Sequence, residues 1–299
     1  MRVLVTGATG YIGTAVIGEL IGAGHAVLGV ARTDAGAEAL TARGIEVHRG
    51  DLTEPETLVA GARACDAVVH TAFIHDFSRF AENAEIERVA VEALLQAMEG
   101  SDKPLVISSG LLMVRPTNGA LAETDVGPDS GRGATENIVT AAARRGVRTA
   151  VIRLAPTVHG KDDRGFIPRL IDIARRSGVA AYIGDGANRW PAAPRRDAAR
   201  LYRLALEKGS PGARYHAVGD EGVPTREIAG AIGRHLNLPV VSLPAEKAGE
   251  HFGFLGMFFG VDAPATARLT RAELGWEPRE PGLLAGLATD AYYQSGSKY

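Results

Sequence analysis

The chain has 299 residues, of which 45% are apolar and 23% charged, and its formal net charge is -2. This composition suits one large α/β domain, or one domain with a smaller lobe, and gives no electrostatic reason to expect nucleic acid as a partner. The single cysteine, Cys65, excludes an intramolecular disulfide, and the apolar stretch 252–261 is too short to cross a bilayer. The start MRVLVTGATG enters a strand without a signal-peptide pattern, so we expect a cytoplasmic protein with no membrane partner.

Short apolar runs alternate with helical segments over the first half of the chain. The expected strands cover residues 2–6, 26–32, 46–49, 67–71, 105–108 and 149–154. The expected helices lie between them, over residues 12–23, 34–42, 55–62, 81–99 and 134–145. Several of these strands are apolar almost throughout, which is typical of strands buried on both faces of a sheet. The alternation predicts an α/β fold with right-handed crossovers and a Rossmann-type, doubly wound parallel sheet.

The second half of the chain has shorter elements, with frequent Pro and Gly between them. We expect helices over residues 167–176, 196–207 and 225–235, and strands over 181–184 and 215–218. This pattern predicts a smaller C-terminal substrate lobe packed at the carboxyl edge of the sheet. The Rossmann domain is placed at residues 1–160, with a strand and a helix returning to it from about 179–220. Residues 161–299 form mostly the lobe.

The segment VLVTGATGYIG places Gly7, Gly10 and Gly13 directly after a strand and at the start of a helix. Gly7 suits a tight turn, Gly10 lets the backbone approach a pyrophosphate, and Gly13 lets the helix pack closely on the strand. The helix N-terminus then offers free N–H groups to phosphates. The segment therefore predicts dinucleotide binding, with a purely structural turn as the alternative.

The end of the second strand predicts which dinucleotide binds. NAD enzymes usually carry an acidic residue there to hold the ribose 2′-OH, but this strand ends Val-Ala-Arg-Thr, at Arg32. A guanidinium can pair with a 2′-phosphate, so the expected cofactor is NADP(H). The alternative is a solvated surface arginine, and the neighbouring Asp34 reads as a helix N-cap.

Further motifs resemble those of one family. GDLTEPETL is similar to its third-strand motif, VVHTAF to its fourth, VISSG to its fifth and VIRLAPTVHG to its sixth. With the glycine loop, they resemble the extended, atypical short-chain dehydrogenase/reductases over essentially the whole chain. The cofactor-binding residues that the loop and the resemblance imply are Gly7, Thr9, Gly10, Tyr11, Ile12, Gly13, Arg32, Asp51, Leu52, Thr71, Ala72, Phe73, Ala155, Pro156 and Val158.

The family carries a catalytic Tyr and a catalytic Lys four residues apart, and this chain departs from the family at both positions. No Tyr occurs between Tyr11 and Tyr182, and no Lys between Lys103 and Lys161. In the family, the Tyr gives the carbonyl oxygen its proton and the Lys lowers the pKa of that Tyr. The resemblance therefore leaves the proton donor unassigned.

When RGATE is laid on the Tyr-x-x-x-Lys motif, Arg132 stands for the Tyr and Glu136 for the Lys. We interpret Arg132 as a surface residue, with an anionic substrate group as the alternative partner, and Glu136 as first-turn charge of a helix. Arg153 is expected to make a structural ion pair. The family's Ser survives as Ser108 or Ser109, and either is expected to position the carbonyl.

An intact cofactor site without that pair predicts an NADPH-dependent ketoreductase whose substrate supplies the proton. Aromatic polyketides carry phenols beside their carbonyls, and the chain most resembles atypical reductases of angucyclinone antibiotic pathways. A positioned general acid raises the reaction rate by roughly 10²–10⁴-fold. The positioning of the substrate beside the cofactor can offset part of its loss. The alternatives are a non-catalytic NADP(H)-binding redox sensor and an enzyme similar to sugar-nucleotide epimerases.

Substrate contacts are expected mainly from the lobe. Aromatic and Met side chains suit a flat apolar ligand, although each can equally belong to the core or to a dimer contact. His75, after the fourth strand, is a candidate substitute acid or a loop residue at the edge of the site. The predicted substrate residues are His75, Phe166, Trp190, Phe254, Met257 and Phe258. The expected partner is a small aromatic ketone, with no metal, and the protein is a monomer or a homodimer.

Overall fold

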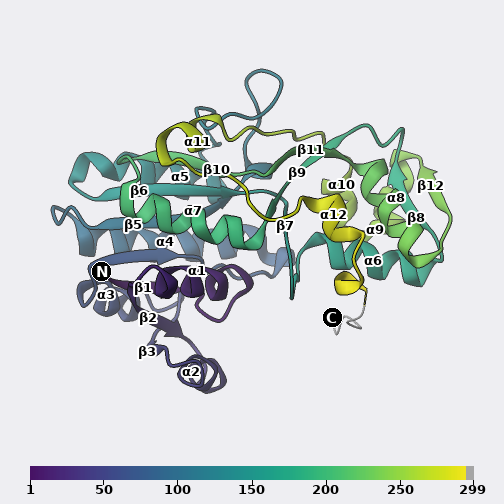
Figure 1. Ribbon diagram of the computed structural model, residues 1–299. Helices are drawn as coiled ribbons and strands as arrows, with labels where there is room; N and C mark the ends of the chain where they lie inside the picture. The colour runs from purple at the N-terminus through teal and green to yellow at the C-terminus, as the bar shows by residue number, and fades with distance from the viewer. Residues whose placement is uncertain (294–299) are drawn as a thin grey trace.

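A seven-stranded parallel sheet forms the centre of the first part of the molecule, in a computed structural model that describes residues 1–293 apart from the side chain of Phe77 (Figure 1). Its strands stand in the order β10-β6-β5-β4-β1-β2-β3, and all neighbours pair in parallel. The strands are β1 (Arg2–Thr6), β2 (Ala26–Ala31), β3 (Glu46–Arg49), β4 (Ala67–His70), β5 (Pro104–Gly110), β6 (Arg148–Leu154) and β10 (Ala213–Ala217). The predicted Rossmann-type doubly wound sheet is confirmed.

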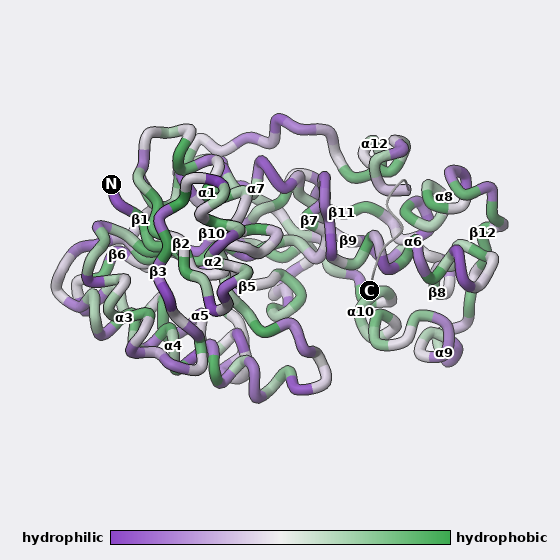
Figure 2. The backbone as a smooth tube through the Cα atoms, turned by 90° about the horizontal axis from the view of Figure 1, so that it is seen from below, coloured by the Kyte–Doolittle hydropathy of each residue, from purple (hydrophilic) through white to green (hydrophobic). Residues whose placement is uncertain are grey.

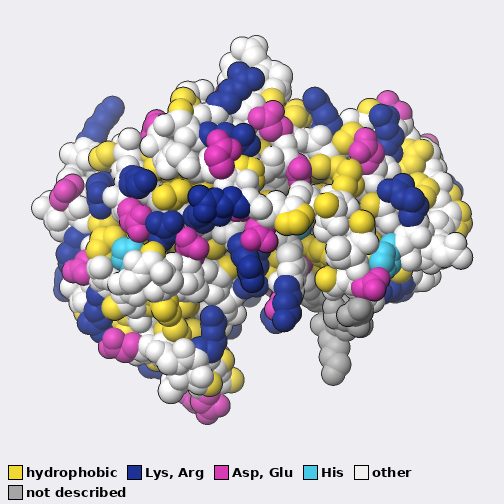
Figure 3. All heavy atoms as spheres, viewed as in Figure 1, with side chains coloured by type: hydrophobic (Ala, Val, Ile, Leu, Met, Phe, Trp, Pro, Cys, Tyr) yellow, Lys and Arg dark blue, Asp and Glu magenta, His cyan; other side chains and the backbone are white. Residues whose placement is uncertain are grey.

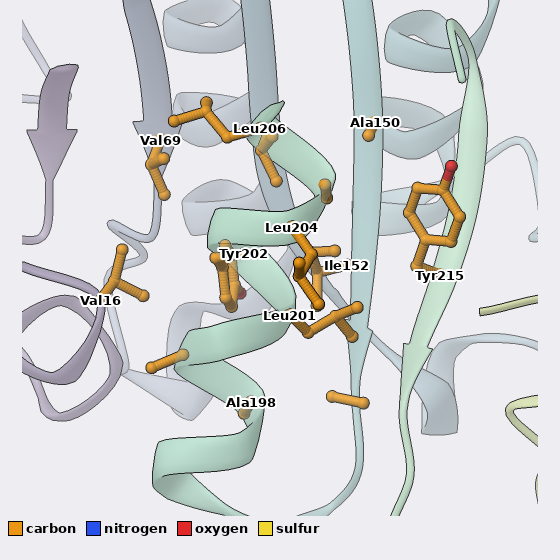
Figure 4. Packing of buried hydrophobic residues seen from close by; sticks show 14 of the residues in the cluster. Val16, Val69, Ala150, Ile152, Ala198, Leu201, Tyr202, Leu204, Leu206 and Tyr215 are labelled. Carbon is orange, nitrogen blue, oxygen red and sulfur yellow. The ribbon is translucent and has the colours of Figure 1, made fainter. Parts of the chain in front are cut away.

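Helices cover both faces of this sheet, because parallel strands need crossover connections. They are α1 (Tyr11–Gly22), α2 (Asp34–Thr41), α3 (Pro55–Arg63), α4 (Phe80–Met98), α5 (Gly131–Ala142) and α7 (Arg195–Lys208). On one face, Ala198, Leu201 and Tyr202 of α7 pack with Val69 and Ile152 of the strands (Figure 4). On the other face, α3, α4 and α5 enclose a second apolar core with the opposite side chains of the same strands.

The second part of the chain forms a smaller lobe to one side of the sheet, with a hydrophobic core of its own (Figures 1 and 2). Its strands are β7 (Thr157–His159), β8 (Ala180–Ile183), β9 (Arg189–Pro194), β11 (Asp220–Pro224) and β12 (Val240–Leu243). Its helices are α6 (Phe166–Ser177), α8 (Thr225–Leu236), α9 (Ala248–Phe252), α10 (Gly256–Phe259) and α12 (Leu283–Leu287). Strands β11, β9 and β7 form one small sheet, and β12 pairs with β8.

Two segments return from the lobe to the main sheet. Helix α7 and strand β10 complete the sheet layer, and α11 (Arg268–Leu274) then packs beside β10. Trp276 is fully buried in the core of the main sheet and its indole N–H donates to the Asp197 carbonyl at 2.8 Å. The chain therefore crosses between the two parts more than once after residue 160.

Short 3-10 helices complete the described structure, at Phe77–Arg79, Leu111–Met113, Ala143–Arg145, Ala245–Lys247, Gly253–Leu255 and Asp290–Tyr292. Across residues 1–293, none of the helices has the length and apolar character that a bilayer crossing requires.

Candidate active site

The loop from Gly7 to Gly13 and the start of α1 form a tight turn that we call the glycine cradle. Gly7 has a φ of +65°, and a Cβ on it would lie 2.8 Å from Ala72 N and from Thr71 Oγ1. A Cβ on Gly13 would lie 2.1 Å from the Gly7 oxygen, so only glycine lets α1 approach the loop this closely. Gly10 N donates to Gly7 O at 2.8 Å, and Gly10 caps α1 without a side-chain bond. The first N–H groups of α1 therefore stay available to an anion.

The segment after β4 lies directly against the glycine cradle. Thr71 Oγ1 donates to Thr6 O at 2.8 Å, and Ala72 N donates to Thr6 Oγ1 at 3.4 Å. These bonds bring Thr71, Ala72 and Phe73 to the carboxyl ends of the central strands, where ligands of open α/β sheets bind. Their contact with a cofactor, like that of Thr9, Tyr11 and Ile12, remains a prediction.

A cavity of about 710 Å³ lies beside the start of α1. Its lining includes Thr9, Tyr11, Thr14, Arg43, Arg195 and Arg196. Arg195 closes one side, because its Nε donates to Tyr11 O at 2.7 Å and its guanidinium lies 4.3 Å from the centre of the Tyr11 ring. Figure 3 shows Lys and Arg side chains gathered over α7 on this face. The sequence pattern missed Arg195, whose guanidinium also donates to Lys161 O and Thr14 Oγ1 and so holds the start of α1 against α7.

At the other end of the cradle, Arg32 follows β2 with its side chain 66% exposed. Its Nε lies 3.7 Å from Asp51 Oδ2, a loose contact that leaves most of the guanidinium open. The expected N-cap role of Asp34 is wrong: Thr33 caps α2 by accepting from Gly36 N at 3.2 Å, and Asp34 pairs with Arg49 at 2.9 Å.

Other predicted cofactor residues lie at the expected strand ends. Leu52 is half-buried after β3 and packs on the core beneath α3, and Ala155 is buried directly after β6. Pro156 follows Ala155, and Val158 lies in β7, half-buried against the main core. Their contact with a cofactor also remains a prediction.

The two candidate serines of β5 point to opposite faces of the sheet. Ser108 Oγ donates to the His70 carbonyl at 3.1 Å and lies 2.6 Å from the hydroxyl of Tyr202, a buried residue of α7 that the sequence analysis missed. Ser109 is 2% exposed, and its Oγ has no hydrogen-bond partner within residues 1–293. Ser109 therefore has the spare hydroxyl, whereas Ser108 is already engaged.

Arg132 lies in the first turn of α5 and is not a surface residue, because only 14% of its side chain is exposed. Its Nε and Nη2 donate to the two carboxylate oxygens of Glu87 at 2.8 and 2.7 Å, and Nη2 also donates to Ser108 O at 2.7 Å. The guanidinium lies 4.4 Å from the centre of the Phe73 ring. Glu87 was missed, although a charged residue on the apolar stripe 84, 87, 91 and 94 of α4 is a signal of a buried partner.

Glu136 does not serve as a solvated helix charge either, because its side chain is fully buried. Arg153 Nε donates to both of its oxygens at 3.1 Å, and Arg214 Nε donates to Oε1 at 2.7 Å. Burial acts to raise the pKa of Glu136, but the bonds and charges of the two arginines lower it below its usual value. The expected structural pairing of Arg153 is confirmed. We call Glu87, Arg132, Glu136, Arg153 and Arg214 the ion-pair cluster.

The histidines near the strand ends carry no imidazolium proton to donate at neutral pH. The ring of His75 packs edge-on against Phe73 at 5.4 Å, and desolvation on that side, together with Arg132, lowers its pKa although the residue is otherwise exposed. Its Nδ1 lies 3.0 Å from Phe73 O. Complete burial, with a smaller effect of Arg132, lowers the pKa of His70 to about 3. Both rings are therefore neutral at pH 7.

The predicted aromatic residues of the lobe divide into core and surface. Trp190 is fully buried in the core of the lobe, so its expected substrate contact is wrong in this arrangement. Phe166 stacks on Phe258 at 5.8 Å and meets Phe254 at 6.4 Å, and these three rings are only partly buried. Met257 is 71% exposed. Within residues 1–293, no group of three or more His, Cys, Asp or Glu side chains is placed to hold a metal ion.

Comparisons with known proteins match this architecture. A model of the "NAD dependent epimerase/dehydratase family" matches residues 3–218. An uncharacterized protein of Schizosaccharomyces pombe is 44% identical over 297 residues, which cover 98% of this chain and all of that protein. The 4-hydroxy-2-methyl-3-oxo-4-farnesyl-3,4-dihydroquinoline-1-oxide ketoreductase of Stigmatella aurantiaca is 30% identical over 188 residues, 58% of this chain and 55% of that protein.

A solved structure supports the fold. A double mutant of the dTDP-glucose 4,6-dehydratase of Streptomyces venezuelae, with NAD bound, matches with a TM-score of 0.77 at 22% identity. The match covers 99% of this chain and 98% of that chain. At this identity, the likeness concerns the architecture of the sheet and the lobe.

Proposed function

We propose that this chain, which belongs to the NAD dependent epimerase/dehydratase family, is an NADPH-dependent ketoreductase. Its proposed substrate is a large aromatic ketone. The observation that carries the proposal is the contrast between an uncapped glycine cradle and an ion-pair cluster that engages Arg132 and Glu136, the two residues that the sequence analysis lays on the family's Tyr and Lys. Epimerisation or dehydration needs an acid and a base at these places. Ketone reduction with a proton from the substrate needs neither.

The glycine cradle fits a dinucleotide, because Gly7 and Gly13 let the loop, the segment after β4 and the start of α1 pack closely together, and no side chain caps the first N–H groups of α1. Gly10 and the first N–H groups of α1 would hold the pyrophosphate. Arg32, exposed and only loosely paired with Asp51, would hold a 2′-phosphate and so favour NADP(H). When bound, the reduced nicotinamide supplies the hydride.

The side chains around the strand ends would orient the ketone rather than protonate it. Tyr202 is fully buried, and burial raises its pKa, so it keeps its proton. The pKa of His75 is lowered, chiefly by desolvation. An arginine holds its protons at neutral pH. These properties support a proton that comes from a hydroxyl of the substrate beside the carbonyl.

The aromatic residues support a flat, apolar substrate. Phe73 lies at the strand ends, and Phe166, Phe254 and Phe258 form a partly buried group in the lobe. The name of the Stigmatella relative describes a ketone at C3 of a dihydroquinoline, a ring system fused to a benzene ring. An angucyclinone-type ketone with a phenol beside the carbonyl, as in antibiotic pathways such as that of simocyclinone, is our proposed substrate class.

The test compares two substrates that differ in one group. The purified protein is mixed with NADPH and an angucyclinone ketone that carries a free phenol beside the carbonyl, or with its methyl ether. We expect one NADPH consumed per alcohol formed, and a rate lower by about 10²-fold or more for the ether, which lacks the proton. Equal rates would contradict protonation by the substrate. Tight NADPH binding without turnover of either ketone would instead favour a redox sensor.

A further inference from the structure

We propose that Arg132 is the oxyanion-binding residue of this site and that its Nη1 donates to the carbonyl oxygen as negative charge develops there. The inference rests on the proposed function for the reaction, but the binding of an anionic oxygen can be tested without turnover. It assigns Arg132 a catalytic role that differs from acid catalysis, because the guanidinium stabilises the oxygen without giving up a proton.

The hydrogen bonds of Arg132 leave one nitrogen over. Nε and Nη2 face the two oxygens of Glu87, and Nη2 also donates to Ser108 O. Nη1 makes no hydrogen bond within residues 1–293. It is also not one of the fully buried side-chain atoms that lack a partner in that part of the chain, so a ligand can reach it. A bidentate Arg–carboxylate pair fixes the plane of the guanidinium, so the direction of Nη1 is fixed as well.

The position of Arg132 is that of a ligand-binding residue. Its bond to Ser108 O fixes it at the carboxyl end of β5, and its stacking on Phe73 fixes it beside the end of β4. Chain order reverses between β4 and β1 in this sheet, and ligands of open α/β sheets bind at the carboxyl ends beside such a reversal. Phe73 also adjoins the glycine cradle through Thr71 and Ala72.

The charge of Arg132 acts on its surroundings despite the partner carboxylate. After burial, Arg132 is the next largest cause that lowers the pKa of both His70 and His75. The Glu87 carboxylate lies on the Nε–Nη2 edge, so the opposite edge of the pair is its positive side. A fixed positive group with little water around it stabilises a developing alkoxide more strongly than water does.

Three variants test the assignment. E87Q/R132Q removes both charges and leaves no buried carboxylate without a partner, and R132K keeps a charge but not the planar fork. The control is E85Q/R88Q, an ion pair on α4, the helix that carries Glu87. That pair has the same two-bond geometry, at 2.8 and 2.5 Å, but Glu85 is 58% exposed on the solvent side of α4.

The first measurement is binding of 2-naphthoate and of the uncharged 2-naphthamide by calorimetry, with NADP⁺ present. We expect the wild type and the control to prefer the carboxylate by about 10-fold, E87Q/R132Q to lose that preference, and R132K, which keeps the charge without the planar fork, to retain only part of it. An unchanged preference in E87Q/R132Q, with its fold verified by circular dichroism, would overturn the proposal. If that variant does not fold, E87M/R132M, which replaces the ion pair with apolar side chains of similar length, is measured in its place, and an unchanged preference in it has the same force.

The second measurement is turnover of the ketone. We expect kcat to fall by about 10²–10³-fold in E87Q/R132Q, with KM changed by less than about threefold, as for the loss of one preorganised oxyanion donor. A kcat within about threefold of the wild type would overturn the role of Arg132. A wild type that binds naphthoate through Arg132 but reduces no ketone would contradict the proposed function while supporting the anion site.

Discussion

The glycine cradle and the ion-pair cluster lie at neighbouring strand ends but use their polar groups in opposite ways. The cradle is made of backbone, and its N–H groups have no side chain to cap them. The ion-pair cluster is made of side chains, and nearly all of its charges are satisfied by one another. The N–H groups at the start of α1 therefore stay free to bind an anion, whereas the ion-pair cluster is fixed in place by its own contacts, with Nη1 of Arg132 without a hydrogen bond in the described part of the chain.

The largest expected effect concerns the ion-pair cluster. In E136Q, Arg153 loses its anionic partner while its side chain is fully buried, so the free energy of unfolding should fall by about 3–5 kcal/mol in urea titrations. The exposed E85Q on α4 should change it by less than about 0.5 kcal/mol. A loss below about 1 kcal/mol in E136Q would mean that the cluster does not hold this end together.

The same carboxylate predicts acid sensitivity. Because the folded-state pKa of Glu136 is lowered from 4.5, its contribution is fully present above pH 4.5 and is lost as the pH falls through the lowered value. The wild type should therefore lose stability below pH 4.5 more steeply than E136Q.

The next largest effect concerns the glycine cradle. In G13A, the new Cβ would lie 2.1 Å from Gly7 O and push α1 away from the loop, so NADPH affinity should fall by about 10²-fold or more. In G22A, on the same helix, the new Cβ meets nothing within 4 Å, and affinity should stay the same. Fluorescence titration with NADPH compares the two. Equal affinities would show that the cradle does not hold the cofactor.

A smaller effect distinguishes the two dinucleotides. R32Q should reduce the preference for NADPH over NADH by about 10-fold, because a charge-assisted pair with the 2′-phosphate is lost. R63Q, which removes an exposed charge at the end of α3, is the control. An unchanged ratio of the two affinities in R32Q would make Arg32 a solvated surface residue.

The smallest effect comes from Asp163, behind the cradle. Its Oδ2 accepts from Tyr292 at 3.0 Å, and burial raises its pKa from 3.8 to about 6. A raised pKa stabilises the fold below pH 3.8, and this contribution is lost as the pH rises through about 6. With allowance for solvent, removing it in D163N should flatten the stability profile between pH 4 and 7 by roughly 1 kcal/mol. Parallel profiles for the two proteins would contradict this.

The main sheet and the glycine cradle could be predicted because their signals are local. Buried parallel strands are continuous apolar runs, and the three glycines stand in one short segment after a strand. In the lobe, β9 was missed because Pro191 and Pro194 weaken the strand signal of Arg189–Pro194. The short strands β7, β11 and β12 carry no pattern long enough to be recognised.

The ion-pair cluster could not be predicted because its partners are far apart in the sequence. Arg132 meets a glutamate 45 residues earlier, and Glu136 meets Arg214 78 residues later. Such pairs depend on how α4, α5, β6 and β10 pack, which no spacing within one element records. The sequence did show that Tyr and Lys are missing from this region, and the structure shows that Arg132 and Glu136 are both engaged in ion pairs.

The central claim is that this protein transfers a hydride to a ketone although the family's acid is missing. The most direct measurement uses NADPH carrying deuterium at C4, on each face in turn, with an angucyclinone ketone, and mass spectrometry of the alcohol. We expect that one of the two labelled cofactors delivers deuterium to the carbinol carbon, one atom per alcohol. Cofactor binding without any labelled alcohol, for both labelled faces and across a panel of aromatic ketones, would contradict it.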